Sequence, residues 1–287
     1  MNIDEIINRF FHTNKGYTYL IDIIKKKYPN FIINEENLKT LKIVPMPKEE
    51  FMRTACSGIY KYDINTIEVF SNIDENGNKI FDLDISDEDL INTFLHELIH
   101  AITSKKDKNN YIIEGINFRT PEGENSIFLG INEGITQMIT DDIMGKQSDA
   151  YPFETTFARQ LALIIGNDKL IELYSSNNYE LFAETLTKLG SNVDIPQFIN
   201  KIFVFHYMCK GLLNDNGYGL GTSIQKDLIN LYKASGVNQD DEFKDLLLDS
   251  DKIYKYMQYI LVIYDDMKYL GFYDVDELIN SFDQWRI

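Results

Sequence analysis

Residues 96–100 of this chain are His96-Glu97-Leu98-Ile99-His100, set within a run of helical periodicity from Leu90 to Thr103. An α-helix advances about 100° and about 1.5 Å per residue, so histidines four positions apart lie on one face, about 6 Å apart along the axis. Their imidazoles can therefore close on one metal ion. The alternative is a pair of core histidines that are satisfied by their neighbours.

The rest of the run supports a buried helix around this pentad. Ser86 can cap the first turn, and the acidic residues 87–89 place negative charge at the positive end of the helix dipole. Lys105 and Lys106 would fall in the last turn, where cations are favoured. Apolar residues at helical spacing predict packing on both flanks, with the histidine face turned to a cleft. They are Leu90, Ile91, Phe94, Leu95, Leu98, Ile99 and Ile102.

The pentad has the residue types of a catalytic zinc site. Zinc takes imidazole nitrogens at about 2.0–2.1 Å in a tetrahedral shell, and catalytic sites use three protein ligands and leave the fourth position to water. Glu97 would lie beside that open position. It could accept a proton from the water, which is the general-base role that this pentad implies in metalloproteases.

A third ligand is expected on a later element, and residues 130–137 supply one. Their sequence, Gly-Ile-Asn-Glu-Gly-Ile-Thr-Gln, opens a second helical pattern from about Ile131 to Ile143, which Gly145 ends. Glu133 is the carboxylate in this stretch, and carboxylates are common zinc ligands.

The stretch HELIHAIT, followed by GINEGIT, resembles the paired signatures of the thermolysin-like zinc endopeptidases, the gluzincins. In that family a glutamate on the helix after the pentad helix completes the zinc shell. The resemblance implies His96, His100 and Glu133 as zinc ligands and Glu97 as the base. It rests on two short segments of the chain.

The chain departs from the family pattern at Gln137, because relatives usually have an aspartate there that holds the first ligand histidine. The side-chain carbonyl of Gln137 could fix the histidine tautomer instead, with weaker polarisation than a carboxylate. Asp141 and Asp142 follow one turn later. The gap between the pentad and Glu133 is also long. Its glycines and proline, which predict a loop or hairpin, are Gly115, Pro121, Gly123 and Gly130.

A peptide hydrolase also needs a donor for the oxyanion that develops when hydroxide attacks the carbonyl. Relatives use a histidine or a tyrosine. Tyr151 is the first candidate, because it opens the helix after Glu133, and helix starts tend to lie near a site. His206 and Tyr111 are the alternatives, although the apolar run at 202–205 favours a satisfied core histidine at His206.

Two segments upstream of the pentad, 58–62 and 66–70, alternate at strand period and predict a β-hairpin. In similar peptidases the edge strand of such a hairpin lines the cleft and pairs with an extended substrate. By resemblance, residues 57–61 would hold the substrate, and an ordinary sheet edge is the alternative. Residues 74–78 predict a surface turn, because their spacing fails the calcium-loop pattern.

Composition fits a soluble enzyme. The 287 residues, 44% of them hydrophobic, can fill one sizeable core or two abutting lobes. Residues 1–11 lack the features of a secretory signal, and the longest apolar runs are far short of the roughly 20 residues that span a bilayer. Cys56 and Cys209 form no metal or disulfide framework. We therefore expect a cytoplasmic protein, although a missing signal leaves specialised export open.

Net charge restricts the partners. At −17 the surface would repel phosphates and anionic lipids, so we expect no nucleic-acid binding and no membrane insertion. Neutral or basic peptides would be attracted. The oligomeric state and the cleavage specificity are left open by the sequence.

Beyond Glu133 the periodicity is helical, and residues 216–221, Asn-Gly-Tyr-Gly-Leu-Gly, predict a loop or hinge.

The expected fold class is α+β and mostly α, a thermolysin-like zincin with the active-site helix between two lobes. Residues 1–105 would form a small N-terminal sheet lobe that ends in this helix, and 106–287 a larger helical lobe. Together they would make one catalytic unit. The predicted helices beyond Glu133 are 151–165, 168–174, 179–189 and 195–213, with about four more in 222–287.

These features predict a zinc-dependent metallopeptidase that hydrolyses peptide bonds of a protein or peptide substrate, with Glu97 as general base. The alternative is a zinc-binding sensor or interaction protein with a peptidase fold but no proteolytic activity, and the substitution at Gln137 favours it. The presence of Glu97 disfavours it, because a structural zinc site has no need of a base and normally closes all four positions with protein ligands.

Overall fold

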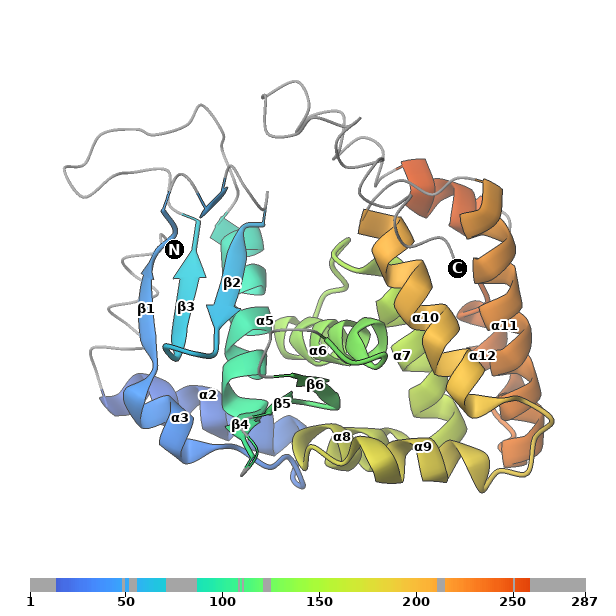
Figure 1. Ribbon diagram of the computed structural model, residues 1–287, viewed down its shortest axis with the longest axis horizontal. Coiled ribbons are helices and arrows are strands. Elements are labelled where there is room, and N and C mark those ends of the chain that lie inside the picture. The colour runs from blue at the N-terminus through green and yellow to red at the C-terminus, as the bar shows by residue number, and fades with distance from the viewer. Residues whose placement is uncertain are drawn as a thin grey trace.

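The computed structural model describes residues 14–47, 50–51, 56–70, 87–107, 109, 111–120, 125–210, 215–249 and 251–258. The fold is mixed α+β and mostly helical, with two small three-stranded sheets (Figure 1). None of the described helices combines the length and the apolar character needed to cross a bilayer. The predictions for Ser86, residues 1–11 and the turn at 74–78 lie outside the described residues.

The first sheet contains β1 (Lys42–Pro45), β2 (Gly58–Lys61) and β3 (Thr66–Val69) in the order β1-β3-β2. β1 runs parallel to β3, and β2 runs antiparallel to it. The predicted hairpin is thus confirmed. Its turn ends at Asn65, which has a left-handed backbone with φ 47°. β2 is an edge strand of this sheet and packs against the pentad helix, as Figure 1 shows.

The pentad lies in α5 (Asp87–Thr103), so the predicted helix is confirmed. The prediction that Lys105 and Lys106 occupy its last turn is wrong. Residues Ser104–Lys106 form β4, because their backbone pairs with β5 (Ile112–Glu114). β5 in turn pairs with β6 (Asn117–Arg119), and these strands make an antiparallel second sheet in the order β4-β5-β6. The long gap before Glu133 therefore contains the hairpin that its turn residues predicted.

Helices make up the remainder of the described chain. α6 (Leu129–Met144) crosses the centre of the molecule in Figure 1 and ends at Gly145, whose φ of 69° is typical of a helix C-cap. α2 and α3 lie below the first sheet in this view, and α7 to α12 follow α6. Their bounds are α2 (Asn14–Lys27), α3 (Glu35–Thr40), α7 (Pro152–Ile165), α8 (Asn167–Ser175), α9 (Tyr179–Thr187), α10 (Ile195–Lys210), α11 (Asp215–Ser235) and α12 (Asp240–Asp245), and residues 251–258 are also helical.

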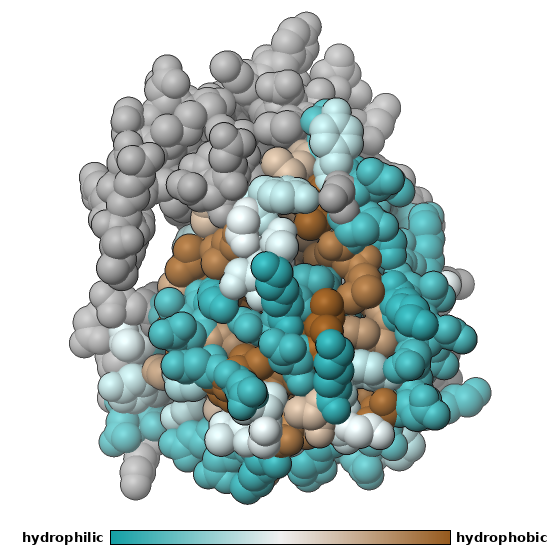
Figure 2. Space-filling model, turned by 90° about the vertical axis from the view of Figure 1, so that its right-hand side faces the viewer, coloured by the Kyte–Doolittle hydropathy of each residue, from teal (hydrophilic) through white to brown (hydrophobic). Residues whose placement is uncertain are grey.

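The loop predicted at 216–221 is wrong, because these residues belong to α11. Glycine costs about 1 kcal/mol relative to alanine in a helix interior. At Gly221 the absence of a side chain has a packing reason, since a Cβ there would lie 3.1 Å from Cε2 of Phe205 in α10, whereas Gly219 has open space around it. Figure 2, which views the molecule from the side of α11, shows hydrophilic side chains interleaved with smaller hydrophobic patches. Such a surface is ordinary for a solvent-facing helix layer.

α6 is buried along most of its length, and its contacts fix the centre of the fold. A Cβ at Gly134 would lie 2.2 Å from the main-chain oxygen of Glu154, so only glycine lets α6 and α7 approach this closely. The buried part of α6 also contains a polar row at four-residue spacing, Glu133, Gln137 and Asp141. Residues at i, i+4 and i+8 share one helix face. This row faces α5.

Candidate metal centre

The two histidines of α5 lie side by side in the interior. His96 is 4% exposed and His100 3% exposed, and their ring centroids are 4.7 Å apart in an edge-to-face arrangement. Their Nε2 atoms are 3.0 Å apart. Both rings thus present the same nitrogen to one point, as the four-residue spacing predicted.

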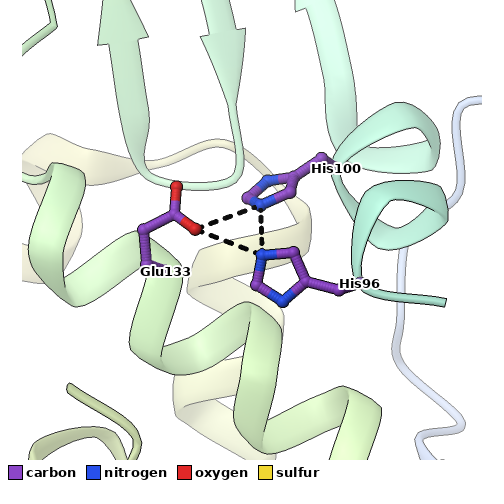
Figure 3. Close-up of side chains that lie close together, drawn as sticks. All are labelled: His96, His100 and Glu133. Atoms are coloured by element: carbon purple, nitrogen blue, oxygen red, sulfur yellow. Dashed lines mark hydrogen bonds and ion pairs between the residues drawn. The ribbon is translucent and has the colours of Figure 1, made fainter. Parts of the chain in front are cut away.

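Glu133 of α6 brings a carboxylate oxygen to the same point (Figure 3). Its Oε2 lies 3.1 Å from Nε2 of His96 and 3.5 Å from Nε2 of His100. Burial alone would raise the pKa of Glu133, but the neighbouring His100 and His96 hold it well below the usual range. Within the described residues, these three side chains form a group that could hold a metal ion.

The separations within this group suit a tetrahedral ion. Ligand atoms at about 2.0–2.2 Å from zinc are separated from one another by about 3.3–3.6 Å. The three observed separations, 3.0, 3.1 and 3.5 Å, lie within a few tenths of an ångström of that range. The set of two imidazoles and one carboxylate also supplies three ligands and leaves a fourth position, as catalytic zinc sites do.

Each histidine has a second contact at Nδ1. Nδ1 of His96 is hydrogen-bonded to Oε1 of Gln137 at 2.9 Å, and Nδ1 of His100 forms an ion pair with Oε1 of Glu114 at 2.5 Å. An acceptor oxygen at this distance favours a proton on Nδ1. In the neutral ring that binds a metal, this leaves the lone pair on Nε2, on the side of Glu133.

Glu114 is a site residue that the sequence pattern did not predict. It lies at the end of β5, is 3% exposed, and occupies the position after two isoleucines and before Gly115. Burial would raise the pKa of this carboxyl, yet the charges of His100 and Arg119 lower it. A lone carboxylate at the end of an apolar run and before a turn is the signal that could have found it, because a charge is rarely buried without a partner.

The turn after β5 holds Glu114 against the histidine. Gly115 has φ 57°, and a Cβ there would lie 2.3 Å from Oδ1 of Asn132. The same Oδ1 accepts hydrogen bonds from the main-chain N–H groups of Ile116 and Asn117, at 3.0 and 3.3 Å. Asn132 of α6 thus anchors the β5–β6 hairpin, and the next residue along this helix is Glu133, the third candidate ligand.

Glu97 lies on α5 between the histidines but outside the three-ligand group. Its Oε2 accepts a hydrogen bond from the main-chain N–H of Tyr60 in β2, at 2.8 Å. The pKa of Glu97 is raised, chiefly by burial and in part by the charge of Glu133, against the opposing effect of the histidines. A carboxylate with a raised pKa is a better proton acceptor than an ordinary one.

Tyr151 lies beside the cluster, as its position before α7 suggested. Its ring stacks on that of His96 at 5.3 Å and on that of His206 at 5.9 Å, and its φ of 49° is left-handed. Burial and the charge of Glu133 hold the pKa of Tyr151 well above its ordinary value. The hydroxyl therefore retains its proton at neutral pH and can act as a donor.

The two alternative donors lie elsewhere. His206 of α10 is fully buried behind Tyr151, and its Nδ1 lies 2.8 Å from Oε1 of Glu154, so the expectation of a core histidine agrees with its burial. Tyr111 lies between β4 and β5 and packs on Phe118 at 6.3 Å, and none of the ring contacts among the described residues joins it to the histidines. Of the three candidates, Tyr151 alone stacks on a histidine of the cluster.

No protein-family model, no curated protein and no solved structure matches this chain.

Proposed function

We propose that this chain is a zinc-dependent metallopeptidase with a thermolysin-like arrangement, which hydrolyses peptide bonds of a protein or peptide substrate. One observation supports this most strongly. His96, His100 and Glu133 converge on a common point, while Glu97 on the same helix as the histidines is left out of the ligand group and bonded to a strand. A structural zinc site would need a fourth protein ligand and no additional carboxylate.

The proposed reaction uses the residues around this point in distinct roles. When bound, zinc would lower the pKa of a water ligand from about 9 for the aqueous ion towards about 7 and polarise the substrate carbonyl. Glu97, held by the N–H of Tyr60, accepts the proton of the attacking water and passes it to the leaving amine. The hydroxyl of Tyr151 donates a hydrogen bond to the developing oxyanion.

In this proposal the substrate pairs with the outer edge of β2, which no other described strand occupies. The main-chain oxygen of Ser57 accepts from the N–H of Phe70, so with this register the odd-numbered residues of β2 face β3. Gly58 and Tyr60 direct their main-chain groups to the outer edge, where the N–H of Tyr60 already binds Glu97. A substrate strand would use Gly58 and the carbonyl of Tyr60. The general base Glu97 is thus hydrogen-bonded to β2, the strand that would orient the substrate.

Zinc-dependent hydrolysis of casein tests the proposal against a sensor or interaction protein. Gln137, which stands where relatives have an aspartate, is the feature that favours such a protein. We expect the purified chain to cleave casein, to lose activity with a chelator and to regain it when zinc is added. The measurement is release of acid-soluble peptides, with zinc content determined in parallel. Stoichiometric zinc without casein cleavage would favour the sensor.

Tyr151→Phe is expected to lower kcat by roughly 10²- to 10³-fold, the typical effect of removing one oxyanion donor. Zinc content should not change, because the ring that stacks on His96 remains. Steady-state kinetics on a fluorogenic peptide measure this effect. Tyr111→Phe serves as the matched control and should leave kcat unchanged. Full activity in Tyr151→Phe, with loss in His206→Gln, would assign the donor role to His206 instead.

A further inference from the structure

The side chain of Gln137 makes hydrogen bonds at both ends of its amide. It is 1% exposed, and its Oε1 lies 2.9 Å from Nδ1 of His96. Its Nε2 donates to Oδ1 of Asp141 at 2.8 Å, to Oγ of Ser148 at 2.9 Å and to Oδ1 of Asn92 at 3.3 Å. The amide is thus buried, with its oxygen on His96, a candidate ligand, and its nitrogen on the carboxylate of Asp141.

Asp141 decides which way this amide points. The oxygen and nitrogen of a glutamine side chain are nearly equal in size, so packing alone does not distinguish the two orientations. The hydroxyl of Ser148 can donate or accept, and the amide of Asn92 can itself turn over. The ionised carboxylate of Asp141 only accepts. It is 2% exposed and also accepts from the main-chain N–H of Ser148 at 3.1 Å, which fixes its own position.

The orientation of Gln137 matters for the proton on His96. With Oε1 toward His96, Nδ1 carries the proton and Nε2 offers a lone pair to the metal position. With the amide reversed, its NH₂ group would face Nδ1, and a neutral imidazole would carry its proton on Nε2. That proton would be donated to Oε2 of Glu133, 3.1 Å away, and would occupy the position of the metal. A metal-binding histidine therefore needs the observed orientation.

We propose that Asp141 is a positioning residue that acts through Gln137 to hold His96 in its metal-binding tautomer. The inference rests on the proposed function for its biological meaning. The polar row Glu133, Gln137 and Asp141 on one face of α6 then has a single purpose: the first residue binds the metal, the second binds the histidine, and the third orients the second. The negative charge of Asp141 thus reaches the histidine through an amide, from one helical turn beyond Gln137.

The test is Asp141→Asn, which removes the charge and allows the neighbouring amide to take either orientation. We expect the zinc Kd to rise about 10- to 100-fold, the range typical of residues that orient a metal ligand. In zinc-loaded protein, the Nδ1–H proton of His96 should lose its hydrogen bond to Gln137 in part, which moves its proton resonance upfield. Asp142→Asn is the matched control. Asp142 contacts Tyr28 and Arg159 rather than Gln137. Arg159 also pairs with Asp141 at 3.6 Å and keeps that partner in Asp142→Asn, so both readouts should stay at their wild-type values.

A compensating variant separates positioning from a general loss of structure. In Gln137→Glu/Asp141→Asn, the new carboxylate at position 137 can accept from Nδ1 of His96, and the new amide at position 141 can donate to it. We expect zinc affinity and the hydrogen-bonded Nδ1–H resonance of His96 to be recovered. The inference is overturned if zinc-loaded wild-type protein shows no hydrogen-bonded Nδ1–H on His96, if folded Asp141→Asn keeps the wild-type resonance and Kd, or if the double variant does not recover them. None of these readouts involves peptide cleavage, so they distinguish this inference from the proposed function.

Discussion

Glu97→Gln is expected to reduce peptide hydrolysis by about 10³-fold or more while zinc remains bound at full stoichiometry. General bases typically contribute about 10²- to 10⁴-fold, and an amide cannot accept the proton of water at neutral pH. The amide oxygen can still accept from the N–H of Tyr60, so the local structure should be kept. Because Glu97 is not one of the three converging side chains, its carboxylate is not needed for metal binding. Peptide kinetics and metal analysis of the same preparation measure both parts.

Glu88→Gln is the matched control for this variant. It makes the same chemical change on the same helix, at a side chain that is 54% exposed and pairs with Lys146 at 3.0 Å on the surface. Exposed ion pairs contribute roughly 0–1 kcal/mol, so both activity and zinc should be unchanged. Hydrolysis at the wild-type rate by Glu97→Gln would show that another group is the base. Loss of zinc in Glu97→Gln would show that Glu97 belongs to the metal shell.

The parts of the site that sequence predicts are those set by local periodicity. The four-residue spacing of the pentad histidines places them on one face of α5, and the spacing of the apolar residues predicts that this face is buried. The bounds of α6 follow from the same kind of pattern, with Gly145 as its stop signal. Even the acceptor on His96 was predictable, since Gln137 lies one turn after Glu133 and must share its face.

Contacts that depend on long-range pairing were not predictable in the same way. Glu114 reaches His100 only because β5 pairs with β4 and β6, and a three-residue strand leaves almost no periodic signal. The same pairing removes Lys105 and Lys106 from the end of α5. The prediction for the glycine-rich stretch 216–221 was wrong for a related reason, because tertiary contacts such as that of Gly221 with Phe205 do not appear in the local sequence.

Loss of the third ligand is the second large effect that we expect. Glu133→Gln should weaken zinc binding by more than the 10- to 100-fold typical of an outer contact, because it removes a negatively charged ligand from the shell. Zinc binding to the native state stabilises it in proportion to the logarithm of ligand concentration over Kd. The wild-type chain should therefore melt at a higher temperature in zinc than in chelator, and Glu133→Gln should lose that difference. Competitive zinc titration and thermal melts measure the two quantities.

Glu68→Gln distinguishes a lost ligand from the mere removal of a buried glutamate. Glu68 is 6% exposed on β3 and pairs with Lys61 at 2.8 Å, so it matches Glu133 in residue type and burial while lying outside the converging group. Its variant should melt at a lower temperature, with or without zinc, and should keep the wild-type zinc affinity. Equal loss of zinc in both variants would mean that folding, and not ligation, explains the effect of Glu133→Gln. Unchanged affinity in Glu133→Gln would mean that the two histidines bind the ion without this carboxylate, and the proposed site would then lose the ligand set on which its chemistry depends.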